Sequence, residues 1–107
     1  MFPRPYPSPE TVFGLQFFGD SMIDAGILDK DWLMINHQST VEPGQIACVR
    51  INGEGKIYRV LKDRVGWYLR SENTSYDIIR PKNLEDSFEI VGEVIAVQRV
   101  MEKPVQA

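Results

Sequence analysis

Residues 18–35 read F-G-D-S-M-I-D-A-G-I-L-D-K-D-W-L-M-I. A strand that ends near Phe18 is followed by Gly19, which permits a sharp turn, and the turn presents Ser21 before a short polar loop. A serine in this position has an exposed hydroxyl, and its backbone N–H is free to stabilise an oxyanion. Because Gly-Asp-Ser is also a common turn, the segment predicts a nucleophile only together with its surroundings.

The rest of the chain reads as short strands between turn residues, with no apolar period of 3.6 sustained over a dozen positions. Asn52-Gly53 permits the positive φ angles of a tight hairpin, and Gly92 allows a bend or bulge in the long last run. We therefore expect a mostly β fold. The expected strands cover residues 12–18, 32–36, 45–52, 56–62, 66–71, 78–80 and 88–101.

A length of 107 residues fits one domain with one core. Four prolines among the first ten residues indicate an extended segment that is short of hydrogen-bond donors. The expected organisation is a proline-rich linker end at residues 1–11, a folded domain at residues 12–101 and a tail at residues 102–107.

Composition excludes several classes of protein. Twelve basic against fifteen acidic residues give a formal charge of -3, and without a basic cluster the chain should not hold DNA by itself. No apolar run reaches the roughly 18 to 20 residues of a membrane span, so a cytoplasmic protein without membrane contact is expected. The lone Cys48 rules out an internal disulfide and should be buried. No metal or cofactor is expected.

The quoted stretch resembles the G-D-S-M, D-x-G-I and D-x-D pattern of the self-cleaving C-terminal domains of LexA, the lambda-type phage repressors and UmuD. The matching positions are 19–22, 24–27 and 29–31. The likeness continues in the Pro43-Gly44 turn, in S-E-N-T-S-Y at 71–76 and in I-V-G-E-V-I at 90–95, so nearly all of residues 12–100 is covered. It implies a compact, strongly bent sheet that forms a partly open, signal-peptidase-like barrel.

The resemblance also implies the roles of single residues. Ser21 stands at the nucleophile position, and the backbone N–H groups of Asp20 and Ser21 stand at the oxyanion site. The family's base is a lysine that burial keeps neutral. Counting back from Ser71 without gaps sets the family's V-K-R-L against residues 57–60, so Tyr58 occupies the base position. A phenol keeps its proton at neutral pH, so self-cleavage is expected to be impaired.

Lys56 is the weaker alternative base. It shares a strand face with Tyr58 but lies two residues away, about 6 to 7 Å along the strand. A slipped register would be needed to bring its amine to Ser21. Lys62 lies further along the same strand, and Arg59 points to the opposite face and stays charged.

The resemblance implies a regulatory and dimerisation domain of a LexA-type or phage-type repressor in the SOS response. The domain would form a homodimer through its C-terminal strand region, contact DNA only through an N-terminal domain missing here, and have the RecA filament as a candidate partner. Twenty residues precede Ser21, with no Ala-Gly bond to cleave, as in a post-cleavage piece. Two alternatives stay open, which are an active Ser/Lys protease using Lys56 and a UmuD-like subunit of a lesion-bypass polymerase.

Overall fold

The computed structural model describes residues 9–80 and 88–101. Most of the predicted linker end at 1–11 and all of the predicted tail at 102–107 therefore lie outside the described residues. The described part contains six strands and one short 3-10 helix. In chain order these are β1 (Val12–Gln16), η1 (Ile23–Ala25), β2 (Trp32–His37), β3 (Ile46–Ile51), β4 (Glu54–Lys62), β5 (Trp67–Arg70) and β6 (Glu89–Gln98).

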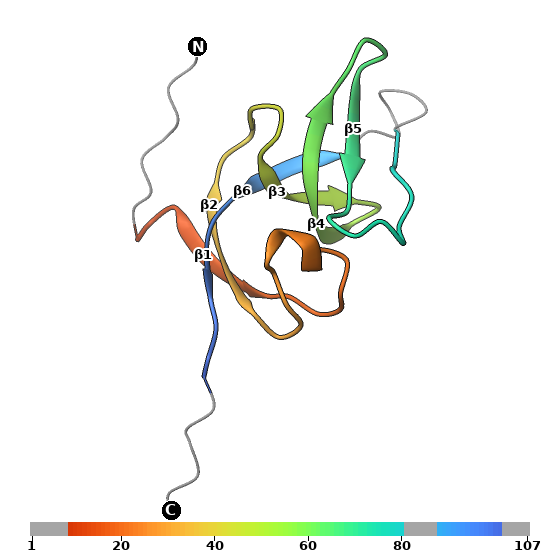
Figure 1. Cartoon of the computed structure of the whole chain (residues 1–107). Coiled ribbons are helices and arrows are strands. Elements are labelled where there is room, and N and C mark those ends of the chain that lie inside the picture. The colour runs from red at the N-terminus through yellow and green to blue at the C-terminus, as the bar shows by residue number, and fades with distance from the viewer. Residues whose placement is uncertain (1–8, 81–87, 102–107) are drawn as a thin grey trace, which may run out of the picture.

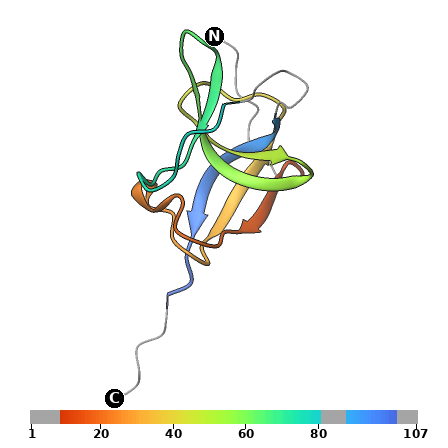
Figure 2. The same cartoon turned by 90° about the vertical axis from the view of Figure 1, so that its right-hand side faces the viewer.

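The six strands form one sheet in the order β1-β2-β6-β3-β4-β5. Every pairing is antiparallel, and β1 and β5 do not pair, so the sheet stays open. Figure 1 shows β6 running between β2 and β3, and Figure 2 shows how strongly the sheet curves. The predicted fold class, a mostly β domain built from a bent and unclosed sheet, is confirmed.

The tight hairpin predicted at Asn52-Gly53 is confirmed. Asn52 has φ 52° and Gly53 has φ 82°, as a two-residue hairpin with a matching twist requires. Ile51 pairs directly with Glu54 across this turn. β4 consequently begins at Glu54, two residues earlier than the sequence pattern predicted.

β6 contains the irregularities that Gly92 predicted. The register shifts opposite Met34/Ile35 and again opposite Cys48/Val49, on either side of Gly92. The glycine itself is required by a close approach, because a Cβ at this position would lie 2.4 Å from the Asn36 carbonyl oxygen. Two bulges thus let one long strand serve both β2 and β3.

The predicted strand at 78–80 is wrong. Only an isolated bridge joins Ile79 to Leu69 of β5, and the side chains of Ile78 and Ile79 are exposed. Pro81 follows directly and has no N–H to continue a ladder. Ile79 therefore forms a single bridge to β5, and the segment does not add a strand to the sheet.

Buried side chains form two groups. The first contains Phe17, Met22, Ile27, Leu33, Ile35, Cys48 and Ile57, and the second contains Ala47, Val49, Val60 and Leu69. β3 contributes to both groups because its successive side chains point to opposite faces. Cys48 is buried as predicted, and burial raises the pKa of its thiol.

Candidate active site

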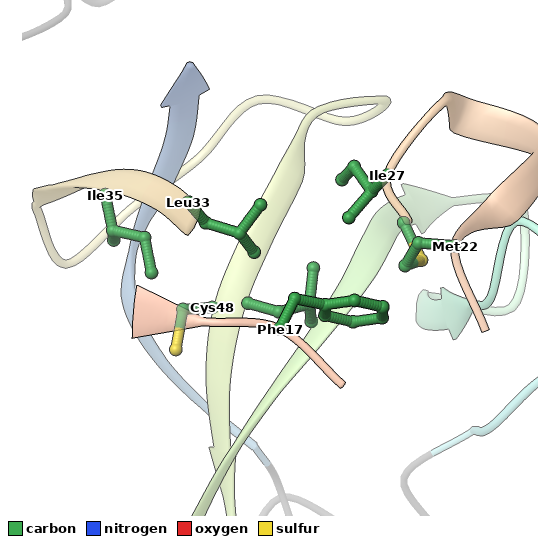
Figure 3. Packing of buried hydrophobic residues seen from close by; sticks show 7 residues of the cluster. Phe17, Met22, Ile27, Leu33, Ile35 and Cys48 are labelled. Atoms are coloured by element: carbon green, nitrogen blue, oxygen red, sulfur yellow. The ribbon is translucent and has the colours of Figure 1, made fainter. Parts of the chain in front are cut away.

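The segment that carries Ser21 is anchored in the core on both sides. Phe17 precedes it and Met22 follows it, and both side chains are buried in the first core group (Figure 3). Between them Gly19 takes φ 98°, a left-handed conformation that side chains rarely adopt. The turn is closed by η1, which ends when the N–H of Gly26 donates to the Ile23 carbonyl. The turn at residues 18–21 is thus held in place by a buried side chain on either side of it.

The polar groups at the tip of this turn are open to a ligand. In the described part of the chain, nothing accepts a hydrogen bond from the backbone N–H of Asp20 or of Ser21, and the Ser21 hydroxyl has no hydrogen-bond partner. Ser21 is half-buried, whereas Asp20 is exposed. Two neighbouring unpaired N–H groups beside a hydroxyl are the donors that a carbonyl oxygen under attack requires.

A cleft of about 410 Å³ opens beside Ser21. It lies between the segment that continues β1 and the first half of β4, where β4 has no β5 partner. Ser21, Lys56 and Tyr58 therefore line one cleft, as the resemblance implied. The full lining consists of Leu15, Gln16, Phe17, Phe18, Gly19, Asp20, Ser21, Gly55, Lys56, Ile57, Tyr58, Ser71 and Tyr76.

Tyr58 is fixed in the wall of the cleft. It pairs with Ala47 of β3, and its half-buried side chain packs against the second core group. Its neighbour Ile57 belongs to the first core group, as strand alternation requires. The position at which the family carries a lysine is therefore filled by an aromatic side chain that is part of the core packing.

Lys56 lines the cleft but lies in solvent. Its side chain is 49% exposed, and its amine lies 3.8 Å from a carboxylate oxygen of Glu54. A lysine base requires the opposite environment, in which burial removes water from the amine and favours the neutral form. Lys62 is engaged elsewhere, with its amine 5.3 Å from the centre of the Trp67 ring.

Arg59 points away from the cleft, as strand alternation predicted. Its guanidinium donates to the Gly44 carbonyl at 2.6 Å and forms an ion pair with Glu72. Burial of Glu72 opposes ionisation of its carboxyl group, but the hydrogen bond and charge of Arg59, helped by Arg70, outweigh this effect and lower the pKa of Glu72. Arg59 thus ties β4 to the segment that follows β5.

That segment, residues 71–76, braces the serine turn (Figure 2). The side-chain amide of Asn73 donates to the Asp20 carbonyl at 2.9 Å, and the Tyr76 hydroxyl donates to the Asp20 carboxylate at 2.6 Å. The Glu72 carbonyl accepts from the N–H of Asp24 at 2.8 Å. The hydrogen bond and the negative charge of Asp20 both raise the pKa of Tyr76.

A second brace comes from the chain beyond β6. Nε and Nη2 of Arg99 each donate to the Asp31 carboxylate at 2.7 Å, and Nη2 also reaches the Gly26 carbonyl at 3.1 Å. Asp31 is 1% exposed, and the Arg99 guanidinium lowers the pKa of its carboxyl. The Asp31 carbonyl accepts from the N–H of Phe17. The loop on the far side of the serine turn is thereby fastened to the end of β6.

The resemblance predicted roles for Ser21, Lys56 and Tyr58, which the structure brings to one cleft, but it gave no role to the residues that surround them. The resemblance includes Ser71, Asn73 and Tyr76 but implies no role for them. Their proximity to Ser21 depends on the chain returning after β5, which short-range patterns do not report. A signal was nevertheless present, since Asn73 and Tyr76 occupy matching places in the family's P-E-N-x-x-Y.

Among residues 9–80 and 88–101, no three His, Cys, Asp or Glu side chains gather as a metal ion would need. In the same residues, no helix is long and apolar enough to cross a membrane.

Comparison with known proteins gives one consistent result. Residues 1–95 match the family described as Peptidase S24-like. The chain is 37% identical to the LexA repressor of Corynebacterium efficiens over 100 residues, which is 88% of the chain and 41% of the relative. It is 38% identical to the LexA repressor of Bacillus subtilis over 104 residues, covering 94% of the chain and 49% of the relative. The chain thus spans less than half the length of these curated relatives.

Proposed function

The chain belongs to the Peptidase S24-like family as a LexA-like C-terminal domain. From this premise we propose that it is the regulatory and dimerisation module of a cytoplasmic transcriptional repressor. We further propose that the self-cleavage of this repressor is impaired. Residues 12–101 would form the folded unit. The similarity of the chain to LexA repressors supports this function over that of a polymerase accessory subunit. Contact with DNA would belong to a separate N-terminal domain, and the RecA filament is the proposed partner that triggers such modules.

One observation carries the proposal. Among the described residues, Asp20 and Ser21 line the cleft with a hydroxyl and two backbone N–H groups that have no hydrogen-bond partner, and Tyr58 occupies the base position in the same lining. Lys56 is the only lysine among the described residues that line this cleft, and it is half exposed. The nucleophile and the oxyanion donors are therefore retained, whereas an enclosed neutral amine to deprotonate Ser21 is missing.

The cleft still suits an extended peptide. Among the described residues, the first half of β4 pairs with β3 alone, so its other backbone edge is open along the cleft. Such an edge binds a peptide by adding a strand. Phe17, Phe18 and Leu15 supply an apolar wall beside it. We propose that the cleft holds the chain's own upstream linker without cutting it efficiently.

The homodimer is proposed to form at the far end of β6. Ile95 and Val97 are 37% and 42% exposed, and Val100 and Met101, just beyond the strand, are 79% and 78% exposed. Four exposed apolar side chains within seven residues are unusual for an unpartnered strand end. A second copy of this strand would cover them, and pairing would let two DNA-binding heads engage two half-sites together.

The test restores the missing base. The chain with its natural upstream linker is incubated at mildly alkaline pH as wild type, Tyr58→Lys and Tyr58→Lys with Ser21→Ala, with and without RecA filaments. In Tyr58→Lys, the amine takes the Ser21 proton, the serine oxygen attacks the linker carbonyl, and the leaving nitrogen receives the proton as the C–N bond breaks. We expect cleavage at least about 100-fold faster than in wild type, and none after removal of Ser21.

The alternative hypothesis is that Lys56, which also lines the cleft, acts as the base for Ser21. If wild type cleaves its linker readily and Lys56→Ala abolishes that cleavage, the chain is an active Ser/Lys protease and the proposal of an impaired one is wrong. Lys62→Ala serves as the matched control, since this lysine lies on the same strand with its amine over Trp67.

A further inference from the structure

The peptide bond between Asp20 and Ser21 is held from outside the turn. Its carbonyl oxygen accepts a hydrogen bond from Nδ2 of Asn73 at 2.9 Å and a longer one, at 3.2 Å, from the N–H of Ile23. A peptide unit is planar, and in the trans form its C=O and N–H point in opposite directions. Whatever fixes the direction of the Asp20 carbonyl therefore also fixes the direction of the Ser21 N–H.

Asn73 is itself held in a single orientation. Its Oδ1 accepts from the N–H of Ser75 at 3.0 Å, and its backbone carbonyl accepts from the N–H of Tyr76 at 3.1 Å. The oxygen of the side-chain amide thus faces a donor and its nitrogen faces an acceptor, so both ends of the amide are matched. The side chain cannot turn without losing both hydrogen bonds.

The residues before Asn73 connect it to the rest of the site. Ser71 is buried and lines the cleft, and Glu72 is paired with Arg59, which follows Tyr58 on β4. The position of Asn73 is consequently set by the strand that carries the base position. The serine turn and β4 are separate elements, and Asn73 links the Asp20 peptide unit to the segment that Arg59 ties to β4.

We propose that Asn73 is a positioning residue that aims the Ser21 backbone N–H into the cleft by holding the Asp20 carbonyl. The role rests on the proposed function, in which that N–H meets the carbonyl oxygen of the linker. Hydrogen-bond donors stabilise a developing oxyanion only when they are aligned beforehand. Tyr76 contacts the same residue but binds the Asp20 side chain, so it does not orient the peptide unit.

The test uses Asn73→Asp, which has the same shape and keeps the acceptor for Ser75 but at neutral pH replaces the donor to Asp20 by a carboxylate. Tyr76→Phe is the matched control, because it removes the hydrogen bond to the Asp20 side chain and leaves both hydrogen bonds to the Asp20 carbonyl in place. Amide ¹H–¹⁵N spectra of the 107-residue chain are recorded for all three proteins. We expect the Ser21 signal to move in Asn73→Asp several-fold more than that of Ser75, and to stay near its wild-type position in Tyr76→Phe.

The functional readout uses the linker-bearing Tyr58→Lys protein. Adding Asn73→Asp should lower the first-order cleavage rate by about 100-fold, the loss typical of one oxyanion donor, whereas adding Lys62→Ala, on β4 but outside the cleft lining, should change it less than about threefold. An unmoved Ser21 amide, an equal shift in Tyr76→Phe, or an unchanged cleavage rate overturns the inference. If Tyr58→Lys itself restores no cleavage, the proposed function has failed, and the amide spectra still decide the role of Asn73.

Discussion

Asp31 shows how a single carboxylate supports the serine loop. It is buried, it accepts both donors of Arg99, and it also accepts from the N–H of Leu28 at 2.8 Å. The pKa of Asp31 in the folded chain is lowered from its ordinary value, chiefly by the hydrogen bond from Arg99. A lowered folded-state pKa means that the ionised form stabilises the fold above the unfolded pKa of about 3.9, and that this stability is lost as the pH falls through the folded value.

Because the pKa of Asp31 is lowered in the folded chain, removing its charge should destabilise the fold at neutral pH. Asp31→Asn keeps the shape but removes the charge that Arg99 binds, so it should unfold at lower urea concentration than wild type at pH 7. The difference should begin to shrink as the pH falls below the unfolded pKa of about 3.9 and should vanish below the lowered folded value, where wild type also loses the charge. Urea midpoints measured from pH 7 to pH 2.5 test this. Glu54→Gln is the control, because Glu54 is exposed and the substitution removes only its ion pair with Lys56, in which the amine lies 3.8 Å from the carboxylate oxygen.

Other carboxylates titrate in the same acid range. The pKa of Asp63 is lowered by Arg80 and that of Glu72 by Arg59, so acid should also weaken the β4–β5 turn and the segment at 71–76. Asp31→Asn removes one of these three contributions. A difference between wild type and Asp31→Asn that stays constant down to pH 2.5 would contradict the role given to the ion pair.

At the scale of elements, β6 depends on the absence of a side chain at Gly92. A Cβ there would lie 2.4 Å from the Asn36 carbonyl oxygen and 2.7 Å from Cγ2 of Ile35, and the first of these is backbone that cannot move alone. Gly92→Ala should therefore lower the free energy of unfolding by about 1 to 3 kcal/mol or more, as overpacked sites do. Chemical denaturation followed by tryptophan fluorescence measures the loss.

Gly55→Ala is the comparison for this substitution. Gly55 is also a strand glycine, but a Cβ there meets only Sγ of Cys48, at an ordinary 3.6 Å. Its effect should be within about 0.5 kcal/mol of zero. Equal losses in the two variants would show that strand glycines matter here for a reason other than the approach of β2 to β6.

The elements were predictable from sequence to the extent that their signals are local. Alternation and the Asn52-Gly53 turn located β3 and β4, and the glycine in the last strand indicated its irregularity. The 3-10 helix at Ile23–Ala25 was missed because three residues carry no periodic pattern. The run at 78–80 looked like a strand because β-branched residues favour strands, yet a strand also needs a free partner along its length.

The site was predictable only through its resemblance to a family. Ser21 and Tyr58 stand 37 residues apart in the sequence, and nothing in composition or periodicity relates them. The cleft that they share arises because β4 extends past the end of β5 and faces the segment that continues β1. Asp31 and Arg99 pair over a still longer separation, and a pairing of this kind is visible only once the sheet order is known.

At the scale of the whole molecule, the exposed apolar side chains beyond β6 predict self-association. We expect the 107-residue chain to sediment as a dimer at tens of micromolar. The double variant Val100→Glu, Met101→Glu should raise the dissociation constant at least about tenfold, equivalent to about 1.4 kcal/mol, without changing the melting temperature of the monomer. Both residues lie outside β6 and are almost fully exposed, so the fold does not depend on them.

Val65→Glu controls for the added charge. Val65 is 82% exposed and lies between β4 and β5, remote from β6 along the sheet order. This variant should dimerise as wild type does. A wild-type chain that sediments only as a monomer at these concentrations would rule out the pairing.

The central position of β6 also bears on how the molecule is made. The ribosome delivers this strand after the other five, yet it lies between β2 and β3. Until it emerges, one half of the sheet ends at β2 and the other begins at β3, with no common strand between them. Ser21 belongs to the first half and Tyr58 to the second. A nascent chain therefore completes the six-stranded sheet beneath the cleft only when residues 89–98 have left the exit tunnel.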